Sequence, residues 1–218
     1  AMELLPHSPQ AFSNMLMMMN YPPNLRPEQI VREHVEFGRR HGRPGAVPPP
    51  VAPVNGRRLR IGYLSPDFRQ HAVSSFVEPF LSSHDHEQFE IFCYASQDEN
   101  DDITQTLRPM ADHWRDVLYM DDDQAAEQIR KDGIDVLLDL AGHTRENRML
   151  VLTRCPAPVQ IIYIGYPNTT GLSAVNYRLT DAVADPPGLT ESHYVETLYR
   201  LPSSFLCFKP HFEQRGPV

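Results

Sequence analysis

Acidic, basic and small polar side chains occupy three short segments, each of which follows a run of apolar residues. In the first segment, residues 65–71, Asp67 and His71 lie just before a predicted helix start near Ser74. A carboxylate and an imidazole at a helix start could accept a proton or hold an anionic group. The alternative is that Asp67 caps a turn and that His71 is a solvated loop residue.

The second segment, residues 139–144, closes another apolar run. Gly142 allows the backbone to come close to a ligand, and His143 and Thr144 offer hydrogen-bond donors beside it. Arg148 follows and could reach a phosphate or a carboxylate. The alternative is a glycine turn whose side chains face solvent.

The third segment, residues 165–171, reads Gly-Tyr-Pro-Asn-Thr-Thr-Gly. Its backbone amides and small hydroxyls could hold a polyol or a phosphate. It lacks the glycine spacings of dinucleotide-binding and P-loop motifs, so it gives no reason to expect NAD or ATP. A simple turn is again the alternative.

Two patterns resemble metal sites, and we interpret both as structural. Residues 121–123 contain the Asp-x-Asp spacing that metal-dependent transferases use, but they directly precede a predicted helix, where acidic residues are favoured as caps. Residues 84–86, His-Asp-His, fall in a polar turn without a distant third ligand. We therefore predict no metal and no cofactor.

The elements that must position these segments alternate between short, continuously apolar strands and helices. This pattern is typical of an α/β fold with a Rossmann-like parallel sheet and helices on both faces. Ligands bind such sheets at the carboxyl ends of the strands, so the loops after the strands matter most. We predict strands over residues 59–64, 89–94, 114–118, 134–140, 159–164 and 177–180, and helices over 74–81, 101–110, 123–131 and 147–154.

Two further helices are predicted before the sheet, over residues 10–20 and from Pro27 onward. In the second, Ile30, His34, Phe37 and His41 repeat at helical spacing and form one apolar stripe with two histidines. A proline-rich stretch follows, which favours an extended spacer. The chain thus divides into a helical lead-in (1–43), a linker (44–57) and a sheet lobe (58–218).

Composition excludes several classes of function. The net charge is −8 and no basic stripe is present, so nucleic acid is not an expected partner. No apolar run is long enough to cross a bilayer, so we expect no membrane partner. The three widely spaced cysteines, Cys93, Cys155 and Cys207, indicate reduced packing residues in a cytoplasmic protein rather than a disulfide framework or a zinc site.

Several motifs together resemble the catalytic region of O-linked N-acetylglucosamine transferases, and the loops resemble those of bacterial members. The motifs occur in the order of that family, and the similarity runs from about Asn14 to the C-terminal end. They are residues 60–68 (RIGYLSPDF) with His71, residues 89–94 (FEIFCY), residues 139–144 (DLAGHT), residues 156–160 (PAPVQ) and residues 165–167 (GYP).

This resemblance implies the amino-terminal half of a GT-B glycosyltransferase, in which two Rossmann-like halves face each other across a cleft. The helical lead-in would follow tetratricopeptide repeats, and the carboxyl-terminal half, absent from this sequence, would supply most donor contacts. The implied reaction transfers N-acetylglucosamine from UDP-N-acetylglucosamine to Ser or Thr hydroxyls of proteins. It proceeds with inversion and without a metal, in the cytoplasm.

The resemblance also assigns roles to individual residues. It places His71 near the acceptor proton, Asp67 as the group that orients it, and His41 as a second candidate on the cleft wall. For this to hold, His41, His71 and Gly165 must converge on one rim of the sheet.

Further residues match the family at positions near the donor or the acceptor. Ile164 does so with a conservative change, whereas His143 and Val73 stand where animal members carry Tyr and Thr. The donor- or acceptor-side positions implied by the resemblance are Ile164, Gly165, Pro167, His143, Thr144 and Arg148.

Three other functions remain open from the sequence. Plant SPINDLY-type relatives use GDP-fucose, and no residue of the amino-terminal half is expected to recognise the base of the nucleotide donor. The chain could instead be a non-catalytic half that docks proteins through its helices. A sheet domain that binds another nucleotide is a third option, against which the missing glycine-rich phosphate loop counts.

Overall fold

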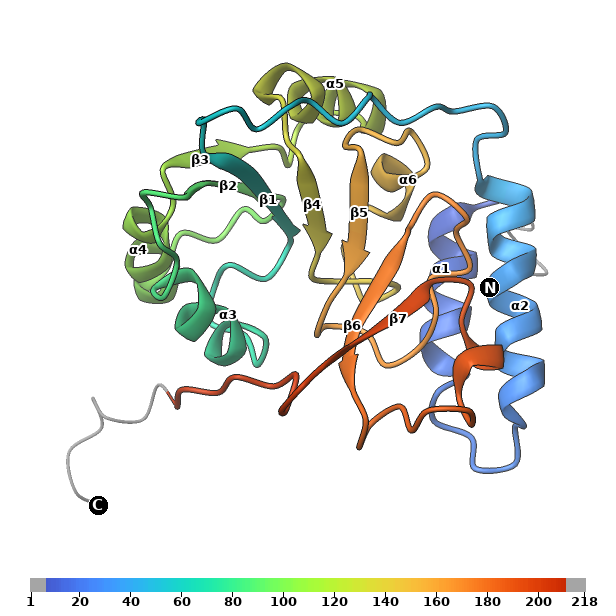
Figure 1. The fold of residues 1–218 in the computed structure, drawn as a ribbon. Helices are drawn as coiled ribbons and strands as arrows, with labels where there is room; N and C mark the ends of the chain where they lie inside the picture. Colours follow the sequence, from blue (N-terminus) through green and yellow to red (C-terminus); the bar gives the residue numbers. More distant parts are fainter. Residues whose placement is uncertain (1–6, 211–218) are drawn as a thin grey trace.

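Seven strands form one sheet in the computed structural model, which describes residues 7–210 (Figure 1). Every pair of neighbouring strands is parallel, and the order is β3-β2-β1-β4-β5-β6-β7. From β1, successive strands are added first on one side (β2, β3) and then on the other (β4 to β7), so the strand order reverses between β1 and β4. Rossmann-like sheets bind ligands at such a reversal. The strands are β1 (Leu59–Ser65), β2 (Phe89–Ala95), β3 (His113–Asp116), β4 (Val136–Asp139), β5 (Val159–Ile162), β6 (Tyr177–Asp181) and β7 (Thr197–Leu201).

Helices cover both faces of this sheet, as predicted. One core joins α1, α2, α5 and α6 to strand residues such as Leu64 and Leu137, and the other joins α3 and α4 to Ile61 and Leu138. Alternate residues of a strand point to opposite faces, which is why both cores draw on the same strands. The helices are α1 (Pro9–Met18), α2 (Pro27–His41), α3 (Ser74–Leu81), α4 (Asp102–Leu107), α5 (Asp122–Asp132) and α6 (Met149–Leu152), with 3₁₀ turns η1 (Arg108–Met110) and η2 (Glu191–His193).

The two amino-terminal helices pack directly on the sheet. Phe12 and Leu16 of α1 and Phe37 of α2 are buried in the same core as Ile162 of β5. Ser8 caps α1, and Pro27 starts α2 at a position where its missing N–H costs nothing. Residues 44–57 contain no helix or strand and run as an extended segment from α2 to β1 (Figure 1).

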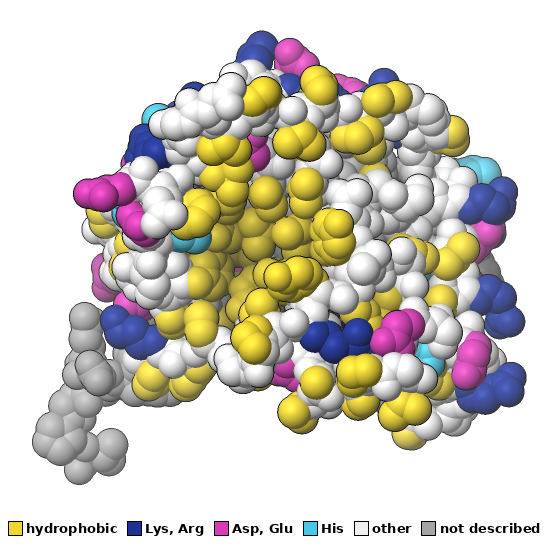
Figure 2. All heavy atoms as spheres, in the orientation of Figure 1, with side chains coloured by type: hydrophobic (Ala, Val, Ile, Leu, Met, Phe, Trp, Pro, Cys, Tyr) yellow, Lys and Arg dark blue, Asp and Glu magenta, His cyan; other side chains and the backbone are white. Residues whose placement is uncertain are grey.

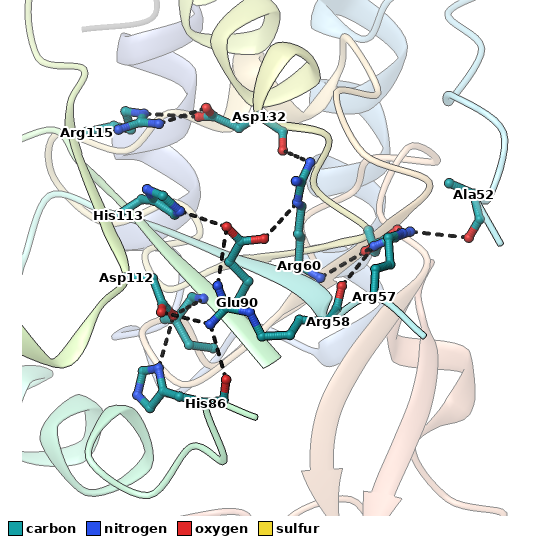
Figure 3. Close-up of polar contacts among 12 residues, drawn as sticks. Ala52, Arg57, Arg58, Arg60, His86, Glu90, Asp112, His113, Arg115 and Asp132 are labelled. Atoms are coloured by element: carbon teal, nitrogen blue, oxygen red, sulfur yellow. Dashed lines mark hydrogen bonds and ion pairs between the residues drawn. The ribbon is translucent and has the colours of Figure 1, made fainter. Parts of the chain in front are cut away.

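The amino ends of β1 and β2 carry a network of charged side chains (Figure 3). Glu90 bonds to Arg60 at 2.9 Å and to His113 at 2.8 Å, while Asp112 bonds to Arg58 and His86 at 3.0 Å each. Because these charges pair with one another, we interpret this edge of the sheet as structural.

The sequence prediction missed β7 and η2. β7 is an edge strand whose residues are exposed or only half-buried, so it lacks the continuous apolar run that revealed the other strands. The remaining strands and helices lie within two to four residues of their predicted bounds.

Part of one sheet face is only partly covered. Figure 2 shows hydrophobic side chains gathered in a hollow at the centre of this view. Among the half-buried residues that pack against the core of α3 and α4 are Phe80, Ile161, Leu179 and Phe205. Within residues 7–210, no helix is long and apolar enough to cross a membrane.

Candidate active site

The loops after β1 and β4 meet at the carboxyl edge of the sheet, beside the point where the strand order reverses. These two strands are neighbours, and β1 ends at Ser65 while β4 ends at Asp139. Arg69 of the first loop lies 3.7 Å from Glu146 of the second. The sequence therefore predicted correctly that these two segments share one edge.

In the first loop, an exposed imidazole lies beside a buried carboxylate. His71 Nδ1 is 3.6 Å from Asp67 Oδ1, and Arg69 Nη2 is 3.7 Å from the same oxygen. The side chain of His71 is 41% exposed and that of Asp67 only 6%. Burial raises the pKa of Asp67, and the charges of His71 and Arg69 oppose that rise. His71 is thus open to a ligand, with an acid behind it.

The tautomer of His71 decides what the pair can do. The backbone N–H of Val73 donates to Nδ1 at 3.3 Å, which requires that Nδ1 carry no proton. A proton on Nδ1 would face Asp67 instead and leave Nε2 free to act as a base. The 3.6 Å separation is longer than a hydrogen bond, so this second arrangement requires the two groups to move closer.

A further acid, which the sequence interpretation did not select, ends β4. Asp139 is fully buried, and its carboxylate accepts hydrogen bonds from the backbone N–H groups of Gly142 and Ala141. Burial raises the pKa of Asp139 to about 7, against the effect of those amides, and the charge of Asp67 adds to the rise. An acid directly after a continuous apolar run was the sequence signal that could have revealed it.

The third loop, residues 165–171, packs against the end of β4. Gly165 is needed there, because a Cβ atom on it would lie 1.9 Å from the carbonyl oxygen of Leu140. Ile164 adopts a left-handed conformation (φ 65°), which is uncommon for a β-branched residue. Pro167 is exposed at the tip. The predicted positions near the donor thus lie at the same edge as the second loop.

The hydroxyl groups of the third loop are not available to a ligand, which corrects the prediction from sequence. Thr169 and Thr170 are fully buried, and both bond to the carboxylate of Glu196. Arg178 donates to the carbonyl oxygens of Tyr166 and Asn168. These bonds hold the loop from its protein side.

His143 is also buried, so its predicted position facing a substrate is wrong. Its Nε2 donates to the carbonyl oxygen of Thr170 at 2.8 Å, and the hydroxyl of Ser13 donates to Nδ1 at 2.7 Å. Burial lowers the pKa of His143 to about 3, which keeps the ring neutral. The side chain therefore connects α1 to the second and third loops.

The side chains of Arg148 and Thr144 likewise bond to other groups of the protein. Arg148 pairs with Asp122 at 3.0 Å and donates to the carbonyl oxygens of Val117 and Met120. The carboxylate that Arg148 contacts is thus that of Asp122 in the protein itself, and its guanidinium is held by these three bonds. Thr144 is half-buried and donates to the carbonyl oxygen of Ala141.

His41 does not join the other site residues, which corrects the expected convergence. It lies at the end of α2 against the rings of Phe12 and Phe37, on the sheet face opposite to α3. The next residue, Gly42, lines a hollow with Pro158, which precedes β5. His71 and Gly165 lie at the carboxyl edge, whereas the end of α2 that carries His41 lies near the start of β5, so the transferase hypothesis cannot rest on that convergence.

The two metal-like patterns have structural roles. Asp121 caps α5 by accepting from the N–H of Gln124, and the Gln124 side chain accepts from the N–H of Asp121. His84 bonds to Tyr63, and His86 bonds to Asp112. Among residues 7–210, no group of three or more His, Cys, Asp or Glu side chains could hold a metal ion. The three cysteines are free.

Together, the strand order and the loops at its reversal define a Rossmann-like lobe, and the candidate site lies at its carboxyl edge. The model of glycosyl transferase family 41 matches residues 41–212, and the chain belongs to this family.

Relatives of known name support that assignment. A probable UDP-N-acetylglucosamine–peptide N-acetylglucosaminyltransferase, SPINDLY of Solanum lycopersicum, is 40% identical over 98% of this chain and 23% of its own length. The UDP-N-acetylglucosamine–peptide N-acetylglucosaminyltransferase of Caenorhabditis elegans is 36% identical over 69% of this chain and 13% of its own.

The fold matches a solved structure of the same kind. A mutant of the O-GlcNAc transferase of Thermobaculum terrenum superposes with a TM-score of 0.88 at 36% identity, over 94% of this chain and 40% of that one. The chain therefore spans between about a tenth and two fifths of the length of these relatives.

Proposed function

We propose that the chain forms the amino-terminal catalytic half of an inverting glycosyltransferase. The enzyme moves N-acetylglucosamine from UDP-N-acetylglucosamine to Ser or Thr hydroxyls of proteins. Membership of family 41 and the names of the relatives support this donor and this class of acceptor. The structural observation that carries the proposal is the exposed His71 beside the buried Asp67, at the reversal of the strand order.

The proposed step needs a group that accepts a proton. The acceptor oxygen attacks the anomeric carbon from the face opposite UDP, the new C–O bond forms, and UDP leaves with the electrons of the broken bond. A hydroxyl is a poor nucleophile, so its proton must pass to a base as the new bond forms. We assign this role to Nε2 of His71, with Asp67 holding the proton on Nδ1 and stabilising the imidazolium.

The rest of the enzyme is proposed from the same family pattern. A second Rossmann-like half supplies the cationic and amide groups that stabilise the leaving diphosphate, and repeats of the tetratricopeptide type precede the helical lead-in. The reaction uses neither a metal nor another cofactor, and the protein works in the cytoplasm. The use of Asp121 as a helix cap supports the metal-free proposal.

The test is a transfer assay on the longest natural form of the protein, with UDP-N-acetylglucosamine and GDP-fucose as alternative donors. We expect transfer from the first donor, and His71→Ala should lower kcat by a factor of about 100 or more. His86→Ala is the matched control, because His86 is similarly exposed but lies in the network at the amino edge.

Three outcomes would contradict the proposal. Near-normal turnover of His71→Ala would remove the assigned base. Transfer from GDP-fucose alone would change the donor. No binding of either donor and no transfer would indicate a non-catalytic docking half.

A further inference from the structure

Asp139 is fully buried, and burying an acid costs free energy unless its oxygens find hydrogen-bond partners. One carboxylate oxygen, Oδ2, accepts from the N–H of Gly142 at 2.6 Å and from that of Ala141 at 3.2 Å. The other oxygen, Oδ1, is enclosed by protein and has no hydrogen-bond partner among the residues that the structure describes. An apolar residue would suit this position better unless the acid has a role.

The turn held by Asp139 packs tightly against the third loop at two glycines. Gly142 has φ 58°, and a Cβ atom on it would lie 2.3 Å from Cβ of Tyr166. On the other side, Gly165 lies against the carbonyl oxygen of Leu140 with no room for a side chain. A shift of the turn at residues 140–144 therefore displaces the backbone at Gly165.

Asp139 also acts electrostatically on the first loop. Asp139 pairs in register with Leu64 of β1, which precedes the loop that carries Asp67, and the charge of Asp67 makes the ionisation of Asp139 less favourable. Asp67 in turn is influenced by His71, Arg69, Glu146 and Glu99. The charge on Asp139 is therefore linked to the Asp67–His71 pair.

We propose that Asp139 is a positioning residue of the transferase site. Its carboxyl group accepts from two backbone amides of the turn at residues 140–144 and so fixes this turn against Gly165. This inference rests on the proposed function, since it concerns the same site.

The experiment uses two substitutions in the longest natural form of the protein, assayed with UDP-N-acetylglucosamine. Asp139→Ala removes the acceptor of both amides, and kcat/KM should fall by about 10- to 100-fold, because a displaced site geometry slows the reaction by such factors. Asp139→Asn resembles the protonated acid. It should match the wild type at pH 6 and lack the part of the change in kcat/KM between pH 6 and pH 8 that comes from ionisation of Asp139. Any pH dependence that arises elsewhere in the site should remain in both proteins.

Asp135→Asn is the matched control. Asp135 is a buried acid at the opposite end of the same strand, where it pairs with Arg57 at 2.6 Å. Its substitution should lower the melting temperature and leave both kcat/KM and its pH dependence unchanged. A purely structural role for Asp139 would give the same result as this control.

Two results would overturn the inference. One is an Asp139→Asn profile that runs parallel to the wild-type profile from pH 6 to pH 8. The other is a kcat/KM for folded Asp139→Ala within about threefold of wild type, where a displaced turn should cost far more. If the wild-type protein itself transfers no sugar, the proposed function fails instead, so the two failures are distinguishable.

Discussion

At the scale of single residues, the carboxyl edge combines one exposed base with two buried acids. Asp67 and Asp139 follow neighbouring strands, and each is shielded from solvent while His71 is open. Burial disfavours a charge on either acid, and the charge of Asp67 makes ionisation of Asp139 harder still. Perturbed acids in such a cluster are typical of functional sites.

Gly165→Ala tests the close contact behind the third loop. Its Cβ would lie 1.9 Å from the backbone oxygen of Leu140, so the backbone must shift. We expect a loss of about 1–3 kcal/mol in unfolding free energy, together with a higher KM for the donor, measured by urea unfolding and steady-state assays.

Gly56→Ala is the control for this substitution. Gly56 has φ 81° and open space around it, so only conformational strain is added, of about 1 kcal/mol. A Gly165→Ala protein with the stability and KM of the wild type would contradict the structural account.

At the scale of elements, the α1–α2 pair anchors the loops of the site through neutral histidines. The hydroxyl of Tyr166 donates to Nε2 of His34, and the hydroxyl of Ser13 donates to Nδ1 of His143. Each bond needs an unprotonated ring nitrogen. Burial lowers the pKa of His34 to about 4 and that of His143 to about 3.

This arrangement predicts that the protein loses stability in acid, because the two histidines that connect the α1–α2 pair to the loops must then bind protons. The pKa of each histidine is lower in the folded chain than in the unfolded one, so the unfolded chain binds protons first. The stability contribution is complete above pH 6.5 and is lost as pH falls toward 3–4. At pH 5, each histidine should lower the free energy of unfolding by about 2 kcal/mol relative to its value above pH 6.5.

His143→Gln isolates the effect of one histidine. The amide keeps a donor and an acceptor but does not titrate. Urea unfolding at pH 7.5 and pH 5 should show an acid-induced loss about 2 kcal/mol smaller than in the wild type. Asp139 has the opposite effect on stability, since its raised pKa favours folding as pH falls below 7. Both proteins contain Asp139, so its effect cancels when the acid-induced losses of the wild type and the variant are compared. Equal losses in both proteins would contradict the prediction.

At the scale of the whole molecule, the sheet separates the paired charges of one edge from the candidate site at the other. The pairs around Glu90 and Asp112 lie at the amino ends of the strands (Figure 3). Asp135, which precedes β4, lies at the same edge, whereas Asp67, His71 and Asp139 lie at the carboxyl ends. Because neighbouring strands are all parallel, the two groups occupy opposite edges.

Glu90→Gln should therefore affect stability but not transfer. The substitution weakens the bonds to Arg60 and His113, and we expect a loss of about 1–3 kcal/mol. Thermal unfolding at low and high salt should show that the loss is smaller at high salt. A changed kcat/KM with unchanged stability would show that this edge takes part in the reaction.

The sequence by itself determined the parallel α/β sheet, because continuous apolar runs are a local pattern. It also determined the caps of α2 and α5. It predicted that the loops after β1 and β4 lie at one edge of the sheet, since chain order fixes which loop follows which strand. It missed β7, whose exposed edge position leaves no apolar run.

Only the tertiary structure decided which polar side chains face a ligand. His143 meets Ser13, 130 residues earlier in the chain, and Arg148 meets Asp122. His41 lies against the rings of Phe12 and Phe37, and Asp139 is fully buried and bonded to the turn that follows it. The same side chain can bond to protein or to substrate, and the choice depends on packing between distant segments, which no local pattern records.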